Sequence, residues 1–186
     1  MKDYALYYSY KGIGDVLIVM FDDIPATRSE DKGRVTVIYN EDKIIGYNVF
    51  DVKDIVKIKS EGMIYLPSPA LVDVINTMLN NAHVEPLDYV THSGYYTAQV
   101  VDANKEETKL SLKDEIVLAP SADLKVNDKV VVAVKGTHLS SGKIIKDKCA
   151  HICTYKELGI NIEEDKILVL DEDVEIGKDF FSSEVR

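Results

Sequence analysis

One segment near the middle of the chain has a clear helical pattern, and it separates two regions of strand-like sequence. The segment begins at LPSPALVDVINTMLNNA, where Ser68 has the side chain of a helix N-cap and Pro69 suits the first helical position. Apolar residues then recur at positions 71, 72, 75, 78 and 79, which indicates one buried face. We expect this face to close over a sheet, because a single amphipathic helix cannot bury it alone.

Before the helix, short β-rich runs alternate with turn residues. The runs lie at about 4–9, 15–21, 34–39 and 43–50, and the breaks between them read KGIG, DDIPATRSEDKG and NED. Val, Ile and Tyr favour strands, whereas Gly, Pro and Asp favour turns. We therefore predict that residues 1–88 form an N-terminal α+β domain with an antiparallel sheet and one long helix.

After NNAHVEPLD the pattern returns to short strands. These lie at 96–102, 107–112, 115–118, 129–135, 143–149 and 167–170, with a brief helical turn near TYKEL. Such a run of short strands is typical of a small Greek-key barrel. We predict that residues 92–181 form an all-β OB-fold barrel and that residues 182–186 form a C-terminal tail.

Composition limits the classes of function. The chain has 186 residues, 46% of them apolar, so it can bury a core. No apolar run reaches the ~18 residues of a spanning helix, and the N-terminus MKDYALYYSY lacks the order of a signal peptide. The two cysteines, Cys149 and Cys153, are so close in sequence that a disulfide between them would stabilise a chain of this size poorly. This spacing fits a reducing compartment. We expect a cytoplasmic protein that does not bind membranes.

The charge is unevenly distributed. The formal net charge is −10, which repels nucleic acid from the molecule as a whole. Seven lysines and two acids between Lys125 and Lys156 give a local balance of +5, and ten acids and three bases between Glu157 and Arg186 give −7. A lysine run is often only a solvated face. On an OB barrel, however, such lysines can contact an oligonucleotide.

Three patterns resemble nucleotide or metal sites but have the wrong spacing. GTHLSSGK has five residues between its glycines where a P-loop has four, and Ile144 replaces the Ser or Thr that would reach magnesium. Cys149, His151 and Cys153 alternate along an expected strand, so neighbouring side chains are about 7 Å apart, too far to converge on one zinc. DEDVE at 171–175 lacks EF-hand spacing. We therefore predict no metal, no cofactor and no enzymatic activity.

Five segments that together span nearly the whole chain point to a known family. They read, in order, YYSYKGIGDVLIVMF, IGYNVFD, PALVDVINTMLN, KVVVAVKGTHLSSGKIIKD and ICTYKELGI. The chain resembles the YtpR-type bacterial tRNA-binding proteins, which have an N-terminal DUF4479-like domain. Their C-terminal half is an EMAP-II-like OB domain, which phenylalanyl-tRNA synthetase β chains and many methionyl-tRNA synthetases also carry.

The resemblance implies non-catalytic binding of tRNA or another structured RNA through a lysine-rich face of the OB domain. The residues expected to contact RNA are Lys135, Ser141, Lys143, Lys146, Lys148 and Lys156. Lysines on long stems can follow a phosphate backbone without requiring one base sequence. We also expect Gly136 and Gly142 to bracket a flexible loop between two barrel strands.

Parts of the family pattern are missing from this chain. The stretch VVDANKEETKLSLKDEIVLAPSAD is shorter than the usual HPNADKL region, and VLAPSAD replaces CGAPNV. KCAHICTYKEL lacks the arginine, glycines and serine of the usual LRGVxSxGMICS. A second interpretation therefore stands beside RNA binding: a shortened, partly degenerate OB domain that has lost RNA binding and acts as a protein-interaction module, as a homodimer or with a protein partner.

Overall fold

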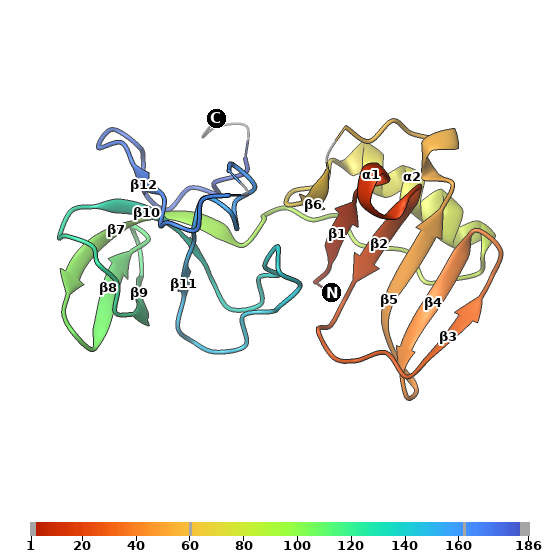
Figure 1. Ribbon diagram of the computed structural model, residues 1–186, viewed down its shortest axis with the longest axis horizontal. Helices are drawn as coiled ribbons and strands as arrows, with labels where there is room; N and C mark the ends of the chain where they lie inside the picture. Colours follow the sequence, from red (N-terminus) through yellow and green to blue (C-terminus); the bar gives the residue numbers. More distant parts are fainter. Residues whose placement is uncertain (1–2, 60, 162, 183–186) are drawn as a thin grey trace. The chain divides into compact units, whose positions relative to one another are not determined.

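The computed structural model of the protein describes residues 3–59, 61–161 and 163–182 (Figure 1). The chain divides into two compact units, Met1–Thr91 and His92–Arg186, and each has its own sheet. Of the tail expected at 182–186, only Ser182 lies within the described residues. No helix in the described part of the chain is both long enough and apolar enough to cross a bilayer.

The first unit is an antiparallel sheet covered by a long helix. Its strands are β1 (Ala5–Tyr8), β2 (Val16–Met20), β3 (Arg28–Asp31), β4 (Val35–Asn40), β5 (Lys43–Phe50) and β6 (Gly62–Ile64), in the order β3-β4-β5-β2-β1-β6. The helix α2 (Pro69–Asn81) lies against this sheet, and the short helices α1 (Tyr10–Ile13) and η1 (Val52–Asp54) follow β1 and β5 (Figure 1). This α+β arrangement agrees with the fold class expected from the sequence.

The core of the first unit forms where α2 meets the sheet. The Ser68 hydroxyl accepts a hydrogen bond from the Leu71 N–H, as expected for the N-cap. One face of the helix is buried, with Val72, Ile75, Met78 and Leu79 as its buried residues. These side chains belong to one apolar cluster with strand residues that include Leu6, Leu17, Val19, Val37 and Val49. The strands alternate between buried and partly exposed residues because successive side chains point to opposite faces.

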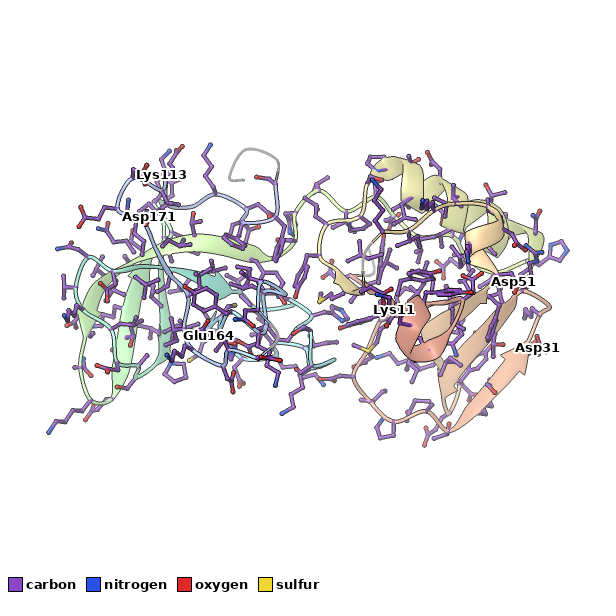
Figure 2. All side chains as sticks on the ribbon, turned by 45° about the horizontal axis from the view of Figure 1, so that its top comes forward. Lys11, Asp31, Asp51, Lys113, Glu164 and Asp171 are labelled. Atoms are coloured by element: carbon purple, nitrogen blue, oxygen red, sulfur yellow. The ribbon has the colours of Figure 1, made fainter. Side chains whose placement is uncertain are left out.

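The two edges of this sheet differ from its centre. Strand β3 pairs only with β4, and all four of its residues, RSED, are exposed. Asp31 marks the end of this strand in Figure 2. At the other edge, β6 has only three residues. Residues 28–31 lie in a predicted break because they show no apolar alternation, and pairing with β4 makes them a strand.

The second unit is a small barrel-like sheet. Its strands are β7 (Tyr95–Ala103), β8 (Glu107–Ser111), β9 (Ile116–Pro120), β10 (Lys129–Ala133), β11 (His151–Ile152) and β12 (Val169–Leu170). The antiparallel order is β11-β10-β7-β8-β9, with β12 paired to β10. The Ala150 N–H donates to the Leu118 carbonyl at 2.7 Å, so the chain just before β11 meets β9. The sheet is therefore nearly closed around a core that includes Val100, Leu110, Val130 and Val132.

One predicted strand of the barrel is absent, and two others are shorter than expected. Residues 143–149, expected to be a strand, form a loop with one isolated bridge between Ile144 and His138. β10 ends at Ala133 instead of 135, and the chain turns at Gly136, whose φ of 91° favours glycine. The predicted strand at 167–170 is reduced to β12. The apolar pattern of KIIK thus reflects partial burial in a loop and not membership of the sheet.

The acidic C-terminal segment runs beside β7. The Thr97 N–H donates to the Lys178 carbonyl at 2.9 Å, and the Phe180 N–H donates to the Tyr95 carbonyl at 2.8 Å. The Asp179 carboxylate accepts hydrogen bonds from the Ser93 N–H, the Ser93 hydroxyl and the Phe181 N–H. Residues up to 182 are therefore part of the barrel's framework. Asp171 and Glu164, from the acidic part of the chain, are labelled on this unit in Figure 2.

Candidate nucleic-acid interface

Residues 134–150 join β10 to β11 and carry the candidate site; we call this segment the basic loop. Its backbone is a hydrogen-bonded hairpin: the Gly136 N–H donates to the Ile145 carbonyl at 2.8 Å, and the Ile145 N–H donates to Thr137 at 3.0 Å. The Leu139 N–H donates to Lys143 at 2.8 Å. A tight turn closes the tip, where the Gly142 N–H donates to the Leu139 carbonyl at 2.9 Å. GTHLSSGK is therefore the turn of a hairpin and not a phosphate-binding helix start.

The base of the basic loop is fixed to the start of β7. The Val134 N–H and the Thr137 hydroxyl both donate to the Gly94 carbonyl, at 3.1 and 3.0 Å. The Tyr95 hydroxyl donates to the His138 carbonyl at 2.8 Å. His138 and Leu139 are buried. The expectation of a flexible loop is corrected accordingly, because these contacts give the hairpin a defined position on the barrel.

Gly94 and Tyr95, which the sequence does not identify as site residues, are buried and support the basic loop. A Cβ at Gly94 would lie 2.2 Å from Thr137 Oγ1, and the φ of this residue is 84°, so another residue type would displace the loop. The signal available in the sequence was the Ser-Gly pair directly before a β-rich run. That pair indicates a turn but does not indicate its distant partner.

Four of the predicted lysines lie in the basic loop. Lys135, Lys143, Lys146 and Lys148 are all exposed, and so is Ser141 at the tip. Lys135 and Lys146 flank the paired residues Gly136 and Ile145, so they lie on opposite arms at the same end of the hairpin. Asp147 is the only acid in the loop, which leaves a local charge of +3 from four lysines. The fold therefore groups these cations on one hairpin of an otherwise acidic chain.

Lys156 belongs to a different part of the barrel. It is exposed in a turn after β11, and its backbone N–H donates to the Glu164 carbonyl at 3.0 Å. The facing segment is acidic, and Glu164 there pairs with Lys166 at 3.9 Å. None of the described contacts joins Lys156 to the basic loop. Five of the six predicted residues therefore lie in the basic loop, and Lys156 lies in the turn after β11.

Lys129, on β10, contacts the acidic C-terminal segment. The Lys129 ammonium donates to the carbonyls of Glu172 and Val174, at 2.5 and 2.6 Å. On β8, Lys109 lies 3.5 Å from Asp102 and 3.7 Å from Glu107. Lys129 and Lys109 therefore each contact acidic residues of the barrel unit.

Cys149, His151 and Cys153 do not converge. His151 Nε2 lies 2.7 Å from Glu157 Oε1, and this hydrogen bond raises the pKa of His151. Burial raises the pKa of the Cys153 thiol well above its ordinary value, whereas Cys149 is exposed. Within the described residues, no cluster of three His, Cys, Asp or Glu side chains could hold a metal. The histidine serves as a partner of Glu157 in the turn after β11.

Strands β8 and β9 contain no aromatic residue; the exposed side of β9 is aliphatic, whereas the less buried residues of β8 are Glu107, Lys109 and Ser111. Ile116 is 57% exposed and Leu118 is 40% exposed, and the two strands read ETKLS and IVLAP. Stacking of unpaired bases needs aromatic or guanidinium planes, and neither is present in these strands. Strands β8 and β9 therefore offer no surface on which unpaired bases could stack.

Comparison with known proteins gives a match in the first unit. A family model described as a domain of unknown function, DUF4479, matches residues 22–87. The match runs from the end of β2 through α2 and agrees with the DUF4479-like N-terminal domain expected from the sequence. No match was found among the curated proteins. The chain is therefore similar to the DUF4479 family over most of its first unit.

Proposed function

We propose that the second unit is an OB-type module that binds the phosphate backbone of structured RNA, such as tRNA, through the basic loop and without catalysis. The observation that carries this proposal is the position of the loop. The strands β7 to β11 are connected as a nearly closed cycle, β7-β8-β9-β11-β10, back to β7. In an OB barrel, ligands contact the second and third strands and the loops after the first and fourth. The basic loop follows β10, which is the fourth of these five strands in chain order.

The charge distribution supports contact with phosphates. The chain as a whole has a formal charge of −10, so a polyanion can approach only where positive charge is concentrated. The exposed lysines at 135, 143, 146 and 148 supply such a place on a hairpin with a fixed backbone. Each phosphate neutralised by a lysine releases counterions, which makes the affinity depend on salt.

The side chains on the surface of the second unit limit the type of RNA that it can recognise. With no aromatic side chain in β8 or β9, the module has no platform for splayed bases. Lysines recognise phosphates as point charges and do not distinguish base sequences. Folded RNA presents phosphates in a fixed arrangement, which is recognised by shape. A folded RNA is therefore a better fit than a specific single-stranded sequence.

A second candidate function rests on the aliphatic surface of β9. Ile116 and Leu118 leave an apolar area on the outside of the barrel, and such an area suits a protein partner or a homodimer. In that case the net negative charge keeps RNA away and the lysines are only a solvated face. The two candidate functions predict different effects of reversing the charge of the lysines: RNA binding should be lost, whereas protein binding should not change.

The test is a titration with bulk tRNA at low salt, using three versions of the full chain. Lys143→Glu/Lys146→Glu reverses two charges of the basic loop. Lys57→Glu/Lys59→Glu changes the net charge equally through exposed residues of the first unit. We expect the loop variant to lose tRNA binding and the control to keep most of it. In single-lysine variants, removing one lysine–phosphate ion pair should reduce the salt slope by about 0.7 to 0.9.

The outcomes separate the two candidates. Equal binding by the parent and the loop variant would remove the basic loop from the function. Binding by none of the versions, together with self-association that Leu118→Asp abolishes in sedimentation experiments, would establish the protein-interaction function instead. A Lys156→Glu variant that binds as the parent does would confirm that this residue lies outside the interface.

A further inference from the structure

The first unit contains a pocket that the RNA-binding proposal does not use. Its volume is about 120 Å³, several times the roughly 10–15 Å³ that one water molecule needs. The residues that line it are Tyr4, Phe21, Tyr47, Glu85, Pro86, Leu87 and Asp88. They come from the ends of neighbouring strands and from the segment after α2, and most of them lie within or beside the DUF4479 match.

Aromatic rings form the walls of the pocket. The ring centroids of Phe21 and Tyr47 are 5.1 Å apart, and the rings stand at 88° to each other. Tyr47 is almost completely buried, so packing fixes its position. Tyr4 is half-buried, and its hydroxyl donates to the Asp88 carbonyl at 2.7 Å. The buried Tyr47 thus forms the base of the pocket, and the partly exposed Tyr4 and Phe21 border it.

The segment that completes the pocket is also held in place. Asn76 on α2 binds both backbone groups of Leu87: its amide donates to the Leu87 carbonyl at 2.9 Å, and its oxygen accepts from the Leu87 N–H at 2.7 Å. The Tyr47 hydroxyl donates to the Glu85 carbonyl at 3.4 Å. These contacts tie residues 85–88 to both the helix and the sheet. The pocket is therefore preformed, as small-molecule sites usually are.

The charges at the pocket have one sign. Glu85 and Asp88 are exposed acids in its lining, and none of the lining residues is basic. Burial, and secondarily the nearby Asp88, raise the pKa of Tyr4 to about 12. Burial, and secondarily Glu85, likewise raise the pKa of Tyr47 to about 12. Both phenols are therefore neutral near pH 7, and their ring faces keep the partial negative charge that attracts cations.

From this combination we infer that the pocket binds an organic ammonium group on a short apolar stem, such as a lysine side chain or a methylated amine. The rings of Tyr4 and Phe21 and the two carboxylates attract such a cation together, and the exposed Pro86 supplies apolar contact for its stem. An anion would meet two carboxylates and no base. A neutral apolar ligand would gain nothing from Glu85 and Asp88.

The test compares a cation with its uncharged analogue. Choline and 3,3-dimethylbutan-1-ol have the same shape, and only choline carries a charge. We expect choline to shift the backbone amide resonances of Tyr47 and Leu87 in the full chain, in a saturable titration. The neutral alcohol should bind at least tenfold more weakly. Equal binding of the two, or no shift with choline at tens of millimolar, would overturn the proposal.

Two variants assign the effect to the pocket. Glu85→Gln/Asp88→Asn removes both charges at exposed positions, and we expect it to weaken choline binding at least fivefold. Glu106→Gln, in the second unit, is the matched control and should leave choline binding unchanged. Phe21→Leu keeps an apolar side chain but removes a ring, and should also weaken binding; the spectrum of each variant shows whether it is folded. Unchanged binding in the double variant would overturn the role of the carboxylates.

A further titration distinguishes the source of the ammonium group. Nα-acetyl-lysine methylamide represents a lysine side chain within a polypeptide, and choline represents a free small cation. Tighter binding of the lysine derivative would assign the pocket to a protein partner's lysine, and tighter binding of choline would assign it to a small metabolite. Both results support the cation pocket, whereas saturable binding of neither would overturn it.

Discussion

The two units of this protein hold their strands together in different ways. In the first unit, a long helix buries its apolar face against a six-stranded sheet, and the core is one continuous cluster. In the second unit, long loops separate β10, β11 and β12, and polar side chains fix segments that are distant in the sequence to one another. Ser93 and Asp179, for example, are 86 residues apart in the sequence. Thr97 likewise donates to the Glu175 carbonyl at 2.7 Å.

This difference predicts how each unit responds to substitution. Apolar burial is spread over many atoms, so the first unit should be most sensitive to the loss of core volume. A hydrogen bond contributes less, about 0.5–1.5 kcal/mol, and in the second unit we expect its loss to act mainly on the loop that it anchors. The position of the basic loop therefore depends on a few polar contacts.

The largest expected effect is in the first unit. Ile75→Ala removes a fully buried side chain from the centre of α2 and should lower the free energy of unfolding by about 2–5 kcal/mol. Hydrogen exchange of peptides from each unit measures this locally: β2 and β5 should exchange faster, with little change in β7. Thr77→Ala, an exposed position on the same helix, is the control and should have a much smaller effect. Equal acceleration in both units would contradict the comparison.

The next effect is in the framework of the barrel. Asp179→Ala removes the acceptor of three hydrogen bonds, from two groups of Ser93 and from Phe181. We expect the second unit to lose about 1–3 kcal/mol, because buried donors are left without a partner. Denaturant unfolding measures this loss of stability, and hydrogen exchange in β7 assigns it to the second unit. Asp173→Ala removes an exposed acid of the same segment and should change little; similar losses in the two variants would point to charge instead of hydrogen bonding.

A smaller effect on stability should have a clear effect on the basic loop. Tyr95→Phe removes only the hydroxyl that donates to His138, which should cost about 1 kcal/mol. If the loop depends on this anchor, residues 136–146 should exchange faster and tRNA affinity should fall at constant net charge. Lys143→Gln is the complementary variant, since it should weaken tRNA binding without changing exchange. The same exchange profile in both variants would show that the anchor does not hold the loop.

The smallest effect concerns pH and the turn after β11. The hydrogen bond with Glu157 raises the pKa of His151 above 6.5. Burial raises the pKa of Glu157, but hydrogen bonds from His151 and Thr154 outweigh burial and lower it below 4.5. The pair should therefore stabilise the second unit most between these values. Stability should fall as pH rises through the folded pKa of His151, and as pH falls through that of Glu157.

Melting temperatures between pH 3.5 and 8.5 check this pH dependence. His151→Gln should remove the loss on the alkaline side while leaving the first unit unchanged. If the melting temperature of the parent changes no more than that of the variant above pH 6, the pair does not contribute to stability.

The sequence predicted the parts of the fold that depend on local patterns. The N-cap at Ser68, the buried face of α2 and the central strands of the first sheet follow from periodicity over a few residues, and the structure confirms them. The strand predicted at 143–149 was wrong because a β-rich run becomes a strand only if a partner is available. Here the backbone groups of residues 143 and 145 instead form hydrogen bonds within the hairpin of residues 136–145.

The candidate sites show the same limit. The lysines at 135, 143, 146 and 148 could be selected from composition alone, because charge is visible in the sequence. Their supports at Gly94 and Tyr95 could not, because the anchoring contacts join residues about 43 positions apart. The cation pocket was also missed: its lining comes from positions 4, 21, 47 and 85–88, which only the sheet order brings together.

The exposed strand β3 has a consequence for how these molecules behave at high concentration. An edge strand has backbone groups that can pair with another chain and start an aggregate. Here an incoming strand would meet Arg28, Glu30 and Asp31, and Arg28 lies 3.6 Å above the ring of Tyr39. Adding a strand at this edge would remove several charges from water. The first sheet is therefore protected from growing into fibrils by the charged side chains of the strand where growth would begin.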